Sequence, residues 1–306
     1  MSRRFGKVAL LLGGSSPERE ISLRSGEQVA QALEECCEEV IRFDPGERSL
    51  SELLQIAPER AFVILHGGSG EDGRVQSWLE LAGIPYTGSG PRACALAIDK
   101  RASLAIWQAA GLPVGKWLIA DADCPPDALA GMVERLGSFP LFVKPNCGGS
   151  SVACGRADDL DQLRELVCAA AQADEQVLIE PLFAGAELSY ALVEGETLPG
   201  VQITAESGFY DYQAKYESDR TGYQCPPPLP EKRQQQLRQL AERAFQLLGC
   251  RSWGRVDLLA DDQDCKLLEV NTVPGMTSHS LVPKAAAAAG IGYGDLVAMI
   301  LEQAQC

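Results

Sequence analysis

The feature that most constrains the fold is a pair of short apolar runs in the last fifth of the chain, joined by a polar turn. The runs are Gly254–Leu259 and Leu267–Met276, and the turn is Asp261–Asp264. Two apolar runs around a short polar turn predict a β-hairpin. Because side chains alternate between the faces of a strand, Glu269 and Asn271 are expected to share one face.

Asp257 is expected to join that face. A turn centred near Gln263 puts Asp257 opposite Glu269, whereas a register shifted by one residue would break the match. Two carboxylates and a carboxamide are hard oxygen ligands of the kind that Mg²⁺ prefers. The alternative is a hairpin with a solvated polar face. Burying carboxylates in an apolar strand without a cation is unfavourable, so the pattern favours a metal site at Asp257, Glu269 and Asn271.

Composition excludes several classes of partner. The chain has 306 residues, enough for two or three domains, and a formal charge of −15, which argues against binding nucleic acid or an anionic membrane. The apolar run at Val8–Leu12 is too short for a signal peptide or a membrane span, so a first strand is the better interpretation. Eleven cysteines without a C-x-x-C pair indicate reduced thiols and a cytoplasmic location.

The N-terminal third alternates between strand and helix patterns, which predicts an α/β domain with a mostly parallel sheet. The expected strands and helices are, in chain order, Lys7–Leu12, Ser22–Glu35, Glu39–Phe43, Ser49–Ile56, Ala61–Leu65 and Arg74–Ala82. Ligands of such sheets bind at the carboxyl ends of strands. Glu18 and His66 follow the first and third strands, although a lone loop histidine can also be incidental.

The middle of the chain carries a second candidate site. One helix is expected over Ala93–Ala110, and a strand over Leu141–Lys144 leads into the loop Pro145–Val152, which is rich in glycine and serine. Backbone N–H groups of such a loop can bind phosphate oxygens while the lysine supplies charge. The lysine precedes the glycines, so this is no Walker A motif. A simple hairpin turn is the alternative.

Further elements complete the expected architecture: Asp159–Ala173, Glu231–Leu248 and Tyr293–Ala304 as helices, and Gln176–Pro181 and Glu187–Val193 as strands. Between Ile203 and Pro226 no periodic segment is found. A loop of that length inside a compact domain is usually functional, often as a lid, and Lys215 and Tyr216 are its candidates.

Taken in order, these motifs resemble the ATP-grasp superfamily and, within it, the D-alanine–D-alanine ligase family, over essentially the whole chain. The matching segments are Leu11–Ser22, Leu65–Gly67, Gly70–Gly73, Tyr86–Gly90, Asp99-Lys100, Val143–Pro145, Gly149–Val152, Tyr210–Tyr216, Gly254–Asp257 and Asn271–Ser280. The resemblance implies an N-terminal parallel α/β domain followed by two α+β lobes that hold ATP between them. We expect the domains at 1–98, 99–183 and 184–306.

The resemblance also implies roles for individual residues. The expected ATP ligands are Lys100, Lys144, Gly149, Ser151, Glu180, Glu187 and Lys215. Asp257, Glu269 and Asn271 would bind two Mg²⁺ ions, with Mn²⁺ as a substitute and a monovalent cation as a further cofactor. The residues expected to act in catalysis are Glu18, Ser150, Tyr216, Arg255 and Gly275. Those expected to contact the substrates are His66, Ser280 and Leu281.

The implied activity is ATP-dependent joining of two D-alanines through an acyl phosphate, for peptidoglycan synthesis, by a homodimer in the cytoplasm. Tyr216 is the residue type of dipeptide-forming members, which favours D-Ala-D-Ala over D-Ala-D-lactate. Two alternatives stay open: an ATP-grasp ligase for another carboxylate and amine, and an ATP-binding module without turnover. The second would be favoured by missing metal ligands or a missing Arg255, and all are present.

Overall fold

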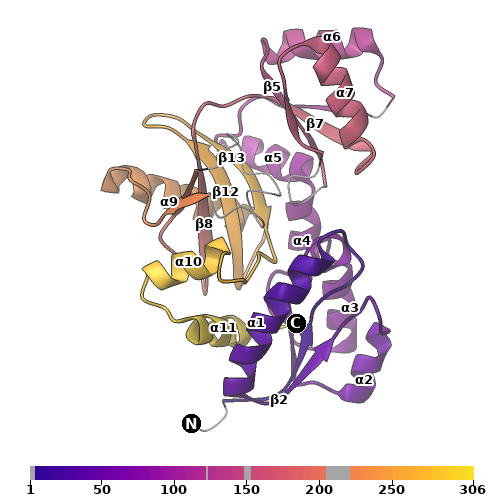
Figure 1. Cartoon of the computed structure of the whole chain (residues 1–306), viewed down its shortest axis with the longest axis vertical. Helices are drawn as coiled ribbons and strands as arrows, with labels where there is room; N and C mark the ends of the chain where they lie inside the picture. Colours follow the sequence, from indigo (N-terminus) through magenta and orange to yellow (C-terminus); the bar gives the residue numbers. More distant parts are fainter. Residues whose placement is uncertain (1–3, 122, 148–152, 205–220) are drawn as a thin grey trace.

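The computed structural model describes residues 4–121, 123–147, 153–204 and 221–306, whose strands form three sheets (Figure 1). The first sheet has the order β2-β1-β3 and is parallel, as predicted. Its strands are β1 Phe5–Leu11, β2 Cys37–Phe43 and β3 Arg60–Val63, and its helices are α1 Arg19–Cys36, α2 Leu53–Ile56 and α3 Arg74–Ala82. Residues 8–11 are fully buried, as expected of a strand covered on both faces.

The expectation of one helix over Ala93–Ala110 is wrong. The structure has two helices, α4 (Pro91–Ile98) and α5 (Lys100–Ala109), and Asp99 between them has extended backbone angles. The Asp99 carboxylate accepts a hydrogen bond from the backbone N–H of Ala102 at 2.9 Å, so it caps α5. The helical spacing of apolar residues continues through both helices, so it predicts a single helix. The Asp99 cap nevertheless starts a new helix, and apolar spacing does not reveal a cap.

The second sheet is antiparallel, with the order β4-β7-β5-β6, and forms a small lobe with two helices. Its strands are β4 Leu118–Asp121, β5 Leu141–Pro145, β6 Gly155–Ala157 and β7 Gln176–Pro181; the helices are α6 Pro126–Leu136 and α7 Leu160–Ala170. Leu129 of α6 and Leu163 of α7 belong to the lobe's own hydrophobic core. The strand expected to end in Lys144 is confirmed within one residue.

The third sheet carries the predicted hairpin at one edge and has the order β11-β10-β8-β12-β13, with β9 on β8. Its strands are β8 Ala186–Val193, β9 Glu196–Thr197, β10 Val201–Thr204, β11 Gly222–Gln224, β12 Trp253–Ala260 and β13 Cys265–Asn271. Three helices accompany it: α9 Glu231–Leu247, α10 Leu281–Ala288 and α11 Tyr293–Glu302.

Asp257 lies opposite Glu269, as predicted, although the register near the turn differs from the expected one. Leu258 pairs with Leu267, and continuing that register would put Asp257 opposite Leu268. An irregularity after Asp257 leaves Leu268 as an extra residue in β13, a β-bulge, and this restores the pairing with Glu269.

The C-terminal helices pack against the N-terminal part of the chain (Figure 1). α11 contacts α1, and Tyr86 forms a β-bridge with Gln305. Leu296 and Ile300 therefore share one hydrophobic core with Val8. Across the described ranges no single helix is long and apolar enough to cross a membrane. α10 and α11 taken together have the necessary length and composition, but they are bent by 106° with respect to each other.

Candidate active site

Asp257 is held by a cation and a hydroxyl on one face of the third sheet. Its carboxylate accepts from Arg255 Nε at 2.9 Å and from Arg255 Nη2 at 2.6 Å. It also accepts from the Ser189 hydroxyl of β8, the strand next to β12, at 2.7 Å. Asp257 is buried, and a buried carboxylate requires such partners. Arg255 and Asp257 share a face because they are two residues apart on one strand.

Glu269 lies beside Lys100, which comes from the first turn of α5. The Lys100 Nζ is 3.2 Å from Glu269 Oε2, so the helix that starts after Asp99 delivers a buried ammonium to the hairpin. Two residues on, Asn271 uses its Oδ1 to accept the backbone N–H of Val273 at 3.2 Å. The face therefore collects two carboxylates and one carboxamide, as the sequence predicted.

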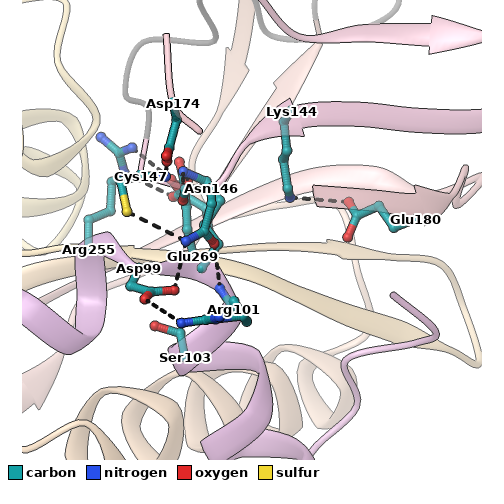
Figure 2. Close-up of polar contacts among 12 residues, drawn as sticks. Asp99, Arg101, Ser103, Lys144, Asn146, Cys147, Asp174, Glu180, Arg255 and Glu269 are labelled. Carbon is teal, nitrogen blue, oxygen red and sulfur yellow. Dashed lines mark hydrogen bonds and ion pairs between the residues drawn. The ribbon is translucent and has the colours of Figure 1, made fainter. Parts of the chain in front are cut away.

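Asn146, which the sequence analysis left without a role, connects the small lobe to the start of α5. Its Oδ1 accepts from the Arg101 backbone N–H at 2.8 Å, and its Nδ2 donates to Asp99 at 2.9 Å (Figure 2). Its carbonyl accepts from Lys100 Nζ at 3.4 Å. This side chain is buried and fixes the lysine relative to the strand that carries Lys144. The only sequence signal was an amide next to the glycine loop.

Glu180 forms two buried ion pairs, one with each of two lysines. Lys144 Nζ of β5 is 3.1 Å from Glu180 Oε1, and Lys266 Nζ of β13 is 3.1 Å from Glu180 Oε2. Figure 2 shows the first pair between adjacent strands of the small lobe. Burial alone would raise the pKa of Glu180, but the two ammonium groups lower it below its ordinary value. Lys266 is the second contributor that the sequence analysis missed.

Glu18 precedes α1 and lies against Gly67 at the carboxyl end of β3. A side-chain carbon added to Gly67 would come within 2.5 Å of Glu18 Oε2, so the carboxylate of Glu18 lies close against the Gly67 backbone. The Gly67 N–H donates to a second carboxylate, Glu71, at 3.0 Å. Burial and the neighbouring Glu18 raise the pKa of Glu71 above its ordinary range. The predicted position of Glu18 at the strand ends is confirmed.

His66 joins three segments of the chain. Its Nδ1 is 2.8 Å from the Val273 carbonyl, and its Nε2 is 3.1 Å from the Ser25 hydroxyl of α1. That hydroxyl accepts the Met276 N–H at 3.2 Å. Since a carbonyl can only accept, Nδ1 carries the proton and Nε2 accepts. Both ring nitrogens therefore have hydrogen-bond partners, and these bonds hold the segment after β13 against α1.

We expect the stability of the fold to fall in weak acid because of His66. Burial lowers the pKa of His66 from 6.5 to about 4. The folded state therefore disfavours the charged ring. The contribution of the neutral His66 ring to the free energy of unfolding is complete above pH 6.5. It is lost as the pH falls towards 4, by up to about 1.4 kcal/mol per pH unit. Denaturant unfolding at several pH values measures this slope. His66→Gln should flatten it, whereas exposed His279→Gln should not; equal slopes in all three proteins would contradict the assignment.

The segment after the hairpin ends at the start of α10. Ser280 occupies the N-cap position of this helix, but its hydroxyl accepts the Thr277 N–H at 3.0 Å and no N–H of the helix. A side-chain carbon on Gly275 would lie 2.8 Å from that hydroxyl, so the backbone approaches closely here. Leu281 is buried in the core. The Gly275 backbone and the Ser280 side chain therefore lie close together.

The remaining predicted residues fall into two groups. Glu187 lies on β8 opposite Leu259, two residues before Ser189 and so on the sheet face that carries Asp257. The others lie outside the described residues: Gly149, Ser150, Ser151, Lys215 and Tyr216.

The donor set of Asp257, Glu269 and Asn271 fits a hard divalent cation, since all three supply oxygen. In the described parts of the chain no group of three or more His, Cys, Asp or Glu side chains is arranged to bind a metal. The expected set contains only two such side chains, with the Asn271 carboxamide as its third donor. Arg255 and Lys100 already provide positive charge beside the two carboxylates. A metal ion would thus replace existing cations there.

Comparison with known proteins gives the family. A profile described as the C-terminus of D-Ala D-Ala ligase matches residues 106–302, and one described as the N-terminus matches residues 38–89. The D-alanine–D-alanine ligase of Azoarcus sp. is 45% identical over 306 residues, covering 100% of this chain and 99% of that protein. The one from Mannheimia succiniciproducens is 44% identical over 298 residues, 97% of each chain.

Solved structures agree. The crystal structure of D-alanine–D-alanine ligase from Bacillus anthracis has a TM-score of 0.84 at 34% identity, and its complex with ATP has a TM-score of 0.83 at 31% identity. Both cover 97% of this chain and 96% of theirs. The fold and the charged site between its lobes place the chain among mixed α/β ligases with two lobes and a parallel-sheet domain. The chain belongs to the D-alanine–D-alanine ligase family.

Proposed function

We propose that the chain joins two D-alanine molecules into D-alanyl-D-alanine at the expense of ATP, forming ADP and phosphate. The observation that carries this proposal is the arrangement of three charged pairs: Arg255 with Asp257, Lys100 with Glu269, and Lys144 with Glu180. They lie where two sheets face each other, and they are the residues that the family resemblance assigns to ATP, metal and the oxyanion.

The chemistry suits these residue types. A carboxylate is a poor electrophile, so that of the first D-alanine attacks the γ-phosphate and becomes an acyl phosphate. Such transfers are catalysed by positioning and charge neutralisation, which Lys100 and Lys144 provide without a nucleophilic side chain. Mg²⁺, two ions by the resemblance, would be held by Asp257, Glu269 and Asn271 and would neutralise the triphosphate. Glu180 and Glu187 would hold the adenosine.

The second half-reaction is an attack by the amine of the second D-alanine on the acyl carbon, which expels phosphate. Arg255 and the Gly275 N–H would donate to the oxyanion that forms. Glu18 would hold the ammonium of the first D-alanine, and Ser280 with Leu281 the carboxylate of the second. His66, saturated by Ser25 and Val273, would fix the loop behind these groups and is not assigned a proton transfer.

The test is ADP release with ATP and Mg²⁺, supplied with D-alanine, with L-alanine, or with D-alanine plus D-lactate, and with products identified by mass. We expect one D-alanyl-D-alanine per ADP with the D-isomer only. ATP binding without turnover of D-alanine would favour an ATP-grasp ligase for another carboxylate and amine. Preferential formation of D-alanyl-D-lactate would contradict the dipeptide assignment.

The proposal has three further parts: the domain bounds, the location in the cell and the assembly. Domains at 1–98, 99–183 and 184–306 are supported by the position of one sheet in each range. Cytoplasmic location is supported by the eleven cysteines, all of which lie in the described parts and are free thiols. Assembly as a homodimer through the N-terminal domain follows from the resemblance, and sedimentation measures it.

A further inference from the structure

Lys266 is a buried lysine that crosses from one sheet to another. It belongs to β13 of the third sheet, and its Nζ contacts Glu180 Oε2 at 3.1 Å and the Pro181 carbonyl at 3.4 Å, both in the small lobe. The side chain is only 5% exposed. In the third sheet Lys266 pairs with Leu259, which pairs on its other side with Glu187. Directly opposed residues share a face, so Lys266 lies on the face of the proposed ATP site.

The charges around Glu180 do not balance within this cluster. Two buried ammonium groups, of Lys144 and Lys266, surround one buried carboxylate. Burial lowers the pKa of Lys266, whereas Glu180 and Glu269 raise that of Lys144 despite its burial. A single lysine would be enough to neutralise Glu180. The presence of the second lysine, Lys266, therefore requires a reason beyond neutralising Glu180.

Two of the three lysines expected to bind ATP phosphate are paired with carboxylates in this structure. Lys100 is paired with Glu269, and Lys144 with Glu180. A triphosphate that takes these ammonium groups leaves two carboxylates behind. Glu269 is an expected metal ligand and can exchange its lysine for Mg²⁺. Glu180 is not an expected metal ligand, and leaving its carboxylate buried without a cation would be strongly unfavourable.

We propose that Lys266 is the counter-ion that stays on Glu180 and thereby frees Lys144 to bind nucleotide phosphate. Lys266 is then a positioning residue for the ATP site. This inference rests on the proposed binding of ATP phosphate by Lys144. It assigns different partners to the two carboxylates: an exchangeable metal for Glu269, and a fixed lysine from the opposite lobe for Glu180.

The test compares ligands with and without phosphate. Lys266→Met removes the ammonium and keeps most of the stem. We expect the dissociation constant for ADP with Mg²⁺, measured by calorimetry, to rise at least about tenfold, because Lys144 must now remain on Glu180. Adenosine lacks phosphate, and its dissociation constant should change by less than about threefold. Lys232→Met, on the exposed first turn of α9, is the matched control and should bind both as the unmodified protein does.

A second background separates a counter-ion from a general electrostatic effect. In Glu180→Gln no carboxylate needs neutralising, so adding Lys266→Met should no longer weaken ADP binding. Three results would each overturn the proposal. They are an equal loss of ADP affinity in both backgrounds, an equal loss of affinity for ADP and for adenosine, and unchanged ADP affinity. Lys266→Gln, which keeps a polar but uncharged group beside Glu180, replaces Lys266→Met if the latter does not fold, with the same expectations. The ligand-binding test is independent of turnover: absent ligation with intact ADP binding would count against the proposed function only.

Discussion

The Arg255→Met variant is expected to release ADP in the presence of D-alanine about 10²–10³ times more slowly than the unmodified protein, the usual loss for one oxyanion donor. In the structure two of the three Arg255 guanidinium nitrogens, Nε and Nη2, donate to Asp257, at 2.9 Å and 2.6 Å. A guanidinium carries five N–H donors, so these contacts with Asp257 do not by themselves prevent Arg255 from donating to an oxyanion. The loss should appear in kcat, with little change in ADP affinity.

Two comparisons make this prediction specific. Arg233 lies near the turn end of the same hairpin, where it donates to the carbonyls of Asp261 and Asp264. Arg233 belongs to α9, so Arg233→Met removes the same functional group from beside the turn of this hairpin and should leave kcat within about twofold, as is usual for surface substitutions. Arg255→Lys keeps the charge but not the two-point geometry and should recover only part of the rate. An Arg255→Met protein with unchanged kcat would remove Arg255 from the reaction.

The sequence was a good guide wherever one residue type in a local pattern decides the outcome. The hairpin follows from two apolar runs around a polar turn, and the parallel sheet from alternation of strands and helices. The positions of Glu18 and His66 follow from the rule that ligands meet at strand ends. Each of these inferences uses neighbours within a few residues, so no knowledge of the final packing is needed.

Lys266 shows why other parts of the site were missed. Strict alternation puts residues three apart on opposite faces, which assigns Lys266 and Glu269 to different sides of the sheet. The extra residue Leu268 reverses that assignment, so both point to the site. A bulge arises from pairing between strands and has no reliable local signature. Asn146 was missed for a related reason, since its partners Asp99 and Arg101 lie more than forty residues away in sequence.

The Trp107→Ala variant is expected to be destabilised by about 3–5 kcal/mol, the range for truncating a large buried aromatic side chain. Trp107 lies on α5 and is fully buried in the core between α5, α9 and the third sheet. Its indole N–H donates to the Ala244 carbonyl of α9 at 3.0 Å. Circular dichroism during urea unfolding measures the loss. Trp107→Phe keeps most of the ring volume and loses the hydrogen bond, so a smaller loss is expected.

This stability effect should extend to the site. Lys100 begins the helix that Trp107 anchors, about two turns earlier, and helix residues seven apart lie on one side. Loosening α5 against α9 therefore frees the ammonium that is held beside Glu269. Below its unfolding transition, Trp107→Ala should bind ADP more weakly than Trp107→Phe. Equal affinities would show that Asn146 and the Asp99 cap position Lys100 without the core. A protein as stable as the unmodified one would contradict the burial of Trp107.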